Sequence, residues 1–476
     1  MKFEHPTLPT TGQGREAIDE RWYGRFERIG SFQAYEYLSG TKEYVIDDTE
    51  NPKAGLLEQQ RRLFFQGVID APKRRYPKLE KFDLKKQEQE LLALKREIHA
   101  NEQNQTVRSA YIWKINEKIA ELRMLRATRE GNDQRFTRYS EFIYGRPDDS
   151  LYQYTLFELS KKIRRALHSD NPLICEIAQR FKSNILGNRT DRGDEQLNLD
   201  DASGSLELIS SSDNPIRFPQ KHTPRKEELD KTLLDYQSII EAFEEALVQY
   251  RISGWTVTKV ENSTAISLNQ ETKSIAIPKT RKLTRQKLSG LIAHEIGVHV
   301  LRREHGERSR LRLLGLGLDR NGDDEGIAMF EEQKITGGNE YAGFGYYFAI
   351  SLARGLDGTP RNFREVFDIL SDYFILTGSK IEQAKNSSWT LCLRVFRGTT
   401  GLTRGACFTK DLSYRKGNID AWQLVSQNAL EVRRFSVGKY DPANPRHIFI
   451  LDQIGITSEN IRELESSTEK PLLASS

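Results

Sequence analysis

The stretch His294-Glu295-Ile296-Gly297-Val298-His299 restricts the fold and chemistry of this 476-residue chain more than any other. Two histidines, with a glutamate directly after the first, supply what a catalytic zinc site needs: neutral imidazole ligands and a carboxylate that can take a proton from metal-bound water. With eight histidines in the chain, chance would produce this arrangement only about 0.01 times. The stretch therefore predicts a site for a divalent metal.

The spacing of the two histidines predicts a distorted helix. In the better-known H-E-x-x-H pattern the histidines are four residues apart and share one helix face. Here they are five apart, and five residues advance a regular α-helix by about 500°, which leaves the rings about 140° apart. One metal ion cannot bind both rings in that geometry. We therefore predict a π-type turn, which Gly297 makes easier.

A small sheet is expected just before the motif. Residues 255–260, 265–268 and 274–277 are rich in β-forming side chains and are separated by turn formers, which predicts three short antiparallel strands. A helix over about 284–303 follows and carries the motif. The fold class expected from these patterns is a predominantly helical α+β protein.

A catalytic zinc usually has three protein ligands and one open position for water, so the motif needs a third ligand from elsewhere. Glu325, 26 residues after His299, is the candidate, in the first turns of a further predicted helix. Acidic residues are also favoured at helix starts by capping and by the helix dipole alone. The position of Glu325 therefore leaves both interpretations open.

The part of the chain before the motif is predicted to be helical. Residues 1–47 show no sustained period and stay unassigned, residues 48–250 form a helical region with a loop or linker at 187–214, and residues 251–476 form the expected catalytic domain. The strongest pattern, at 84–127, predicts a two-helix hairpin that turns near 101–105. We expect a projecting, solvated hairpin. A docking arm for a protein partner is the alternative.

Composition excludes several classes of protein. Lys and Arg total 72 and Asp and Glu 68, so the net charge of +4 gives no argument for a nucleic-acid partner. The three cysteines lack the paired spacing of a zinc cluster or disulfide framework. No signal-like apolar start and no apolar stretch of roughly 20 residues is present, so no membrane segment is expected. We expect a soluble, cytoplasmic protein.

Several further stretches agree with a known family. Asp324-Glu325-Gly326-Ile327-Ala328 follows the histidine motif, and the blocks at 51–52, 58–65, 76–77, 394–398 and 408–417 occur around it. Together they resemble the microtubule-associated tyrosine carboxypeptidases and their bacterial relatives, which are known by a Gln-Glu-Gly-Leu-Ala motif. Asp324 stands where that family has Gln or Glu, and Ile327 where it has Leu.

The resemblance implies a zinc carboxypeptidase that acts on the C-terminus of a peptide or protein. It implies one Zn²⁺ per chain, with His294, His299 and Glu325 as ligands and Glu295 as the base. Release of tyrosine is suggested only by the animal relatives, and a microtubule partner does not carry over.

A carboxypeptidase must also recognise the free carboxylate of its substrate. Arg397 and Lys410 are our candidates for that contact, because cationic side chains bind carboxylates by charge-assisted hydrogen bonds. Tyr414 is the candidate donor to the oxyanion that develops during hydrolysis. Two alternatives remain: a metallo-endopeptidase or aminopeptidase with the same metal core, and a regulatory protein with a structural metal that binds its partner through the hairpin.

Overall fold

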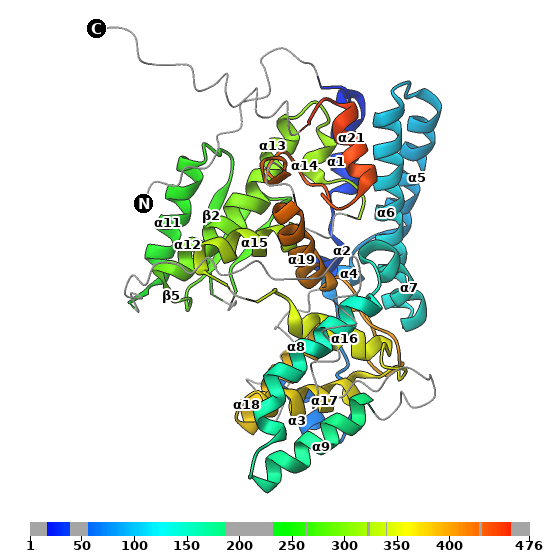
Figure 1. Ribbon diagram of the computed structural model, residues 1–476. Helices are drawn as coiled ribbons and strands as arrows, with labels where there is room; N and C mark the ends of the chain where they lie inside the picture. Colours follow the sequence, from blue (N-terminus) through cyan, green and yellow to red (C-terminus); the bar gives the residue numbers. More distant parts are fainter. Residues whose placement is uncertain are drawn as a thin grey trace, which may run out of the picture.

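The computed structural model describes seven stretches of the chain, which are mostly helical with two small sheets (Figure 1). The predicted linker at 187–214 lies entirely outside the described residues, and of the unassigned segment 1–47 only residues 17–38 are described. The described stretches are residues 17–38, 56–186, 232–261, 265–320, 324–338, 340–427 and 431–457.

Helices dominate the part of the chain before residue 250. Two of them, α1 and α2, fall within the segment that the sequence left unassigned. The bounds are α1 Glu20–Gly30, α2 Ala34–Tyr37, α3 Leu56–Phe65, α4 Pro77–Glu80, α5 Leu84–Asn101, α6 Gln105–Arg129, α7 Asp133–Tyr144, α8 Asp149–Leu167, α9 Pro172–Leu186 and α11 Tyr236–Gln249.

Short strands and more helices follow. The strands are β1 Leu233–Leu234, β2 Thr256–Val260, β3 Ser267–Asn269, β4 Ser274–Pro278 and β5 Leu283–Thr284. The helices are α12 Arg285–His294, the π-helix η1 Glu295–Val300, α13 Leu301–Arg308, α14 Leu313–Leu316, α15 Asp324–Thr336, α16 Phe344–Arg354, α17 Phe363–Leu376, α18 Ile381–Val395, α19 Leu412–Gln427, α20 Glu431–Arg434 and α21 Pro445–Gln453.

The sheet before the motif helix is mixed, so the predicted all-antiparallel sheet is wrong in one pairing. The strand order is β2-β4-β3, with β3 antiparallel and β2 parallel to β4. The chain reverses direction from β2 to β3 and again from β3 to β4. Because β4 takes the central place, where Ile275 and Ile277 are fully buried, it meets β2 in the parallel direction. A separate antiparallel pair joins β1 to β5.

The predicted two-helix hairpin is confirmed, but its projection into solvent is not. Helices α5 and α6 run side by side (Figure 1), and the turn lies at residues 102–104. Helix α6 also packs against α2, α4, α7 and α21, and most of its residues are buried. The sequence pattern misled us because several charged side chains of α6 are buried as pairs, which removes the usual cost of burying a lone charge.

The buried charges of α6 form a ladder of four side chains on one face: Lys114, Glu117, Lys118 and Glu121, each about 5% exposed or less. Lys114 lies 2.7 Å from Glu117, and Lys118 lies 3.0 Å from Glu121. The same groups bind the main chain of two loops. On one side, the ladder forms hydrogen bonds with the carbonyl of residue 32 and the amide of residue 34. On the other side, it forms hydrogen bonds with the carbonyl of residue 318 and the amide of residue 320.

The apolar core draws on both parts of the chain. One cluster joins α1, α5 and α6 to residues 311–318 and to α21. A second joins α3, α8 and α9 to α16, α17 and α18, seen as the lower layer of Figure 1. The division at residue 250 stays a prediction. Within the part of the chain that the structure describes, no helix is both long and apolar enough to cross a bilayer.

Close packing of α15 on α19 gives a stability prediction. A Cβ atom at Gly326 would lie 2.1 Å from the main-chain carbon of Gly417, and backbone atoms cannot move aside. We expect Gly326→Ala to lower the free energy of unfolding by about 3 kcal/mol, at the upper end of overpacking effects. The urea midpoint measures this change. Gly24→Ala is the control, because a Cβ atom at Gly24 would have no neighbour within 4 Å. Replacing an exposed helical glycine with alanine should raise the free energy of unfolding by about 0.5–1 kcal/mol. Equal midpoints for the two variants would contradict the packing argument.

Candidate metal centre

The helix that carries the motif is distorted where the spacing predicted. Residues Glu295–Val300 form a π-helix between α12 and α13. The main-chain N–H of Leu301 donates to the carbonyl of Ile296, five residues earlier. The predicted π-type turn is therefore confirmed. As a result, the ring centroids of His294 and His299 lie only 5.2 Å apart, with an interplanar angle of 67°.

Apolar contacts on two sides of η1 determine which face of the helix is left for the histidines. Ile296 and Val300 pack in the cluster that contains the central strand β4. Val298 packs on the opposite side, with residues of α15 and α19. Because the apolar residues of η1 are held by these two layers, the face that remains carries the two histidines.

The third predicted ligand comes to the same place. Glu325, in the first turn of α15, has its Oε2 atom 3.7 Å from the Nε2 atom of His294 and 3.7 Å from that of His299. One ligand atom from each of the three residues falls within 4.8 Å of the others. Ligands of a tetrahedral zinc are about 3.4 Å apart, given bonds of about 2.0–2.1 Å. The donor set of two imidazoles and a carboxylate therefore fits a zinc ion after a contraction of less than about 1.5 Å.

Each histidine also meets a second acidic side chain that sequence reasoning missed. The Nδ1 atom of His294 lies 3.1 Å from Oε2 of Glu332, and Nδ1 of His299 lies 3.8 Å from Oδ2 of Asp324. Glu332 carried a signal, because it follows Glu325 by seven residues and so falls on the same face two turns later.

The charge of Asp324 is balanced by cations from two other segments. The fully buried Arg302 of α13 forms an ion pair with Asp324, and the Nζ atom of Lys439 lies 3.7 Å from it. These cations keep the pKa of Asp324 below its usual range despite its burial. The carboxylate is therefore ionised beside the cluster.

The electrostatics of the cluster favour positive charge. Burial lowers the pKa of His294, but the carboxylates of Glu325 and Glu332 outweigh it and raise that pKa to about 10. Burial raises the pKa of Glu295, although both histidines act against this shift. A bound divalent cation would satisfy the same carboxylates.

The cluster opens onto a charged cavity. His299 and Glu325 line it, and the ladder of α6 forms one wall. The other charged or polar residues of the lining include Gln33, Tyr35, Tyr144, Gln270, Glu271, Arg303, Arg320, Asp324, Lys410, Ser413 and Lys439. A cavity with this lining suits a polar or charged substrate.

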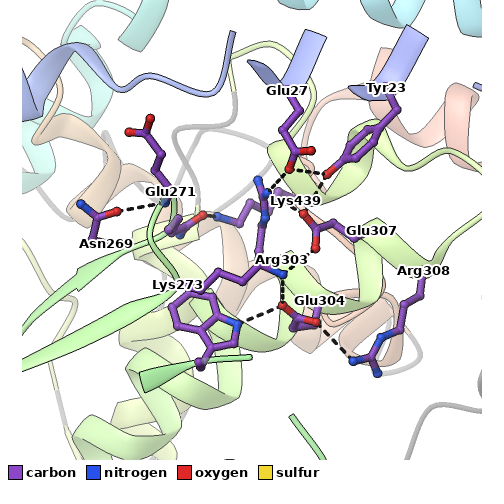
Figure 2. Close-up of polar contacts among 12 residues, drawn as sticks. Tyr23, Glu27, Asn269, Glu271, Lys273, Arg303, Glu304, Glu307, Arg308 and Lys439 are labelled. Carbon is purple, nitrogen blue, oxygen red and sulfur yellow. Dashed lines mark hydrogen bonds and ion pairs between the residues drawn. The ribbon is translucent and has the colours of Figure 1, made fainter. Parts of the chain in front are cut away.

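A network of ion pairs joins the elements at the rim of the cavity (Figure 2). Arg303 of α13 lies 2.9 Å from Glu27 of α1 and 2.5 Å from Glu307. Lys273, after the turn from β3 to β4, lies 2.7 Å from Glu304 and 2.9 Å from Glu307. The sheet, α1 and α13 are therefore tied together beside the cluster.

The structure places the three predicted substrate contacts at different distances from the cluster. Lys410 is at the site: its Nζ atom lies 3.7 Å from Oε1 of Glu325, and it lines the cavity. Tyr414 is not part of the lining; burial, and after it the charge of Glu325, raise its pKa. Arg397 is not part of the lining; it lies near Asp411, whose charge acts against the lowering of its pKa by burial.

A π-distorted helix with two histidines, completed by a glutamate from a second helix, defines a mostly helical protein with a His-His-Glu group that could hold a metal ion. Comparison with family models identifies the family within this class. The model described as microtubule-associated tyrosine carboxypeptidase matches residues 61–182 and 207–460. Because these segments make up most of the chain, the protein belongs to that family, and the predicted resemblance is confirmed. No curated protein matches the sequence.

Proposed function

We propose that this protein is a zinc-dependent carboxypeptidase that removes the C-terminal residue of a peptide or protein. The observation that carries the proposal is the grouping of ligand atoms of His294, His299 and Glu325 within 4.8 Å, with Glu295 next to the first histidine in the sequence. Of these residues, His299 and Glu325 line a charged cavity. Family membership supports the same activity. The family's name makes a tyrosine-ended peptide the first substrate to try, and we place the reaction in the cytoplasm.

In this proposal each residue of the motif has a separate task. His294, His299 and Glu325 would hold one zinc ion, which, when bound, lowers the pKa of a water ligand and polarises the substrate carbonyl. Glu295 takes the proton from the attacking water and delivers it to the nitrogen of the departing residue. The new C–O bond forms first and places negative charge on the former carbonyl oxygen. The C–N bond breaks when the carbonyl forms again, and the proton that Glu295 carried leaves with the amine.

Lys410 is the cation that we propose for the terminal carboxylate. Three other cations of the cavity have short contacts with acidic groups: Lys114 with Glu117 at 2.7 Å, Lys118 with Glu121 at 3.0 Å and Arg303 with Glu307 at 2.5 Å. Lys410 lies at the longer distance of 3.7 Å from Glu325, a carboxylate that a metal would neutralise. Tyr414 remains the proposed donor to the oxyanion, and Arg397 a proposed second contact for the carboxylate.

Lys410→Met tests the carboxylate contact. Wild-type protein should release the last residue of a peptide with a free C-terminus and leave the C-terminally amidated peptide intact. Loss of a charge-assisted hydrogen bond is worth about 1.5–3 kcal/mol, so the variant should lose about 10–100-fold in kcat/KM on the free acid. Lys334→Met is the control, because Lys334 lies on the same helix as Glu325 but pairs with Glu331 outside the cavity.

The products distinguish the alternatives. Cleavage of the amidated peptide at an internal bond would identify an endopeptidase, and release of the first residue an aminopeptidase. A protein that binds metal but cleaves nothing would favour the regulatory alternative, in which the outer face of α5 in the hairpin is the surface left for a partner.

A further inference from the structure

We propose that Glu332 is a positioning residue of the metal centre, which holds the ring of His294 so that its Nε2 atom faces the metal. The inference rests on the proposed function, because it presupposes a metal at His294, His299 and Glu325. Glu332 would not touch the metal. It would act through the histidine, by accepting a hydrogen bond from the Nδ1–H group.

The two nitrogens of His294 face two carboxylates of the same helix. Nδ1 lies 3.1 Å from Glu332, which is hydrogen-bond distance, and Nε2 lies 3.7 Å from Glu325. A neutral histidine, the form that binds a metal, carries its free electron pair on Nε2 when it donates from Nδ1, and Nε2 is the atom on the side of the proposed metal. Carboxylates placed in this way fix the tautomer and the ring orientation of metal-binding histidines and make the ligand more basic.

Helix packing holds Glu332 against the ring. Helix α12 packs tightly on α15 at Gly290, one turn before His294, where a Cβ atom would lie 3.1 Å from Cγ of Glu332 and 2.8 Å from Thr336. On the other face of α15, Gln333 accepts hydrogen bonds from Asn418 at 2.9 Å and Trp422 at 2.8 Å. With α15 held from both sides, Glu332 has little freedom to turn away.

Asp324, beside the other histidine, serves a different purpose. Its 3.8 Å separation from His299 is longer than a hydrogen bond. It pairs instead with Arg302, which is fully buried and donates to the main-chain carbonyls of residues 438 and 440 at 2.7 and 2.6 Å. Removal of Asp324 would leave a buried guanidinium without its charge partner. The side chain of Glu332 is 26% exposed, and when it is removed His294 keeps Glu325 as an acidic neighbour.

The affinity for zinc tests the inference. We would measure it by competition with a chromogenic chelator, on full-length protein stripped of metal and then reloaded. Glu332→Ala should bind zinc about 10–100-fold more weakly than wild type, as expected for loss of such a partner. Glu332→Gln, which keeps an acceptor oxygen but not the charge, should fall between them. Glu331→Gln, one residue away and paired with Lys334, should match wild type.

Two further readouts separate positioning from folding. The melting temperature of metal-free Glu332→Ala should stay within about 1 °C of wild type, the shift that a change of about 1 kcal/mol would produce in a chain of this length. The visible spectrum of the Co²⁺-loaded variant should differ from that of wild type, because it reports ligand geometry. Gly290→Ala, which displaces Glu332 without removing it, should also weaken zinc binding.

The outcomes distinguish this inference from the proposed function. If wild type binds no zinc, the proposed function fails, and the inference fails with it. If wild type binds zinc and Glu332→Ala binds it equally well with an unchanged Co²⁺ spectrum, the positioning role is wrong while the proposed function stands. A metal-free Glu332→Ala that melts several degrees lower would also overturn the inference, because the residue would then act in folding.

Discussion

Glu295→Gln is expected to lower kcat about 10³-fold and to leave metal content unchanged, since general-base catalysis contributes about 10²–10⁴-fold. Glutamine has nearly the same shape as glutamate but cannot accept the proton of the attacking water. Burial raises the pKa of Glu295, which makes its carboxylate a better proton acceptor. Because Glu295 is not one of the three proposed ligands, the metal should stay bound. The measurements are kcat on a peptide with a free C-terminus and zinc per chain by mass spectrometry.

Glu331→Gln serves again as the matched control, because it makes the same chemical change on α15 outside the proposed catalytic groups. Its kcat should equal that of wild type. A Glu295→Gln protein with normal metal content and more than about a tenth of wild-type kcat would show that another group is the base, since the expected loss is at least about 10²-fold.

His299→Ala is expected to remove the metal. Wild-type protein should contain about one zinc ion per chain, and the variant less than about a tenth of that after purification, because two protein ligands hold zinc far more weakly than three. Glu325→Ala should behave in the same way. Zinc should raise the melting temperature of the metal-free wild type, since an ion that binds only the native state stabilises it, and should leave both variants unchanged.

The chain offers a control histidine close by. His305, six residues after His299, lies in α13, and its Nδ1 atom is 2.9 Å from the main-chain oxygen of Ser436. It lies outside the three-residue group, so His305→Ala should keep a full complement of metal. Full zinc content in His299→Ala would contradict the proposed ligand set and would favour the alternative of a regulatory protein.

The distorted helix could be predicted because its cause is local. A five-residue spacing between two histidines can serve one metal only if the helix is widened, so the spacing alone indicated η1. The hairpin of α5 and α6 was also predictable, since two helical patterns with a short polar break between them leave few alternatives. Glu325 was placed near the histidines from its motif, and the structure brings it there.

Features that depend on contacts between distant segments could not be read in the same way. Strand β4 takes the central place because Ile275 and Ile277 are buried there. The alternation of apolar residues in the sequence does not indicate which strand lies at the centre of the sheet. The burial of α6 follows from the pairing of its lysines with its glutamates and from its contacts with two loops, 86–87 and 203–204 residues away along the chain. The seven-residue spacing places Glu332 on the same face of α15 as Glu325, but only the packing of α12 against α15 brings His294 to it.

The ladder on α6 has a practical consequence for anyone who wants a shorter version of this protein. One helix from the first third of the chain bonds the main chain at residues 318 and 320, just ahead of Glu325. A truncated protein that began after residue 250 would lack these hydrogen bonds from α6. The peptide groups at residues 318 and 320 would then have to bond to water instead. A shortened version of this protein must therefore keep α6 or carry a designed replacement for it.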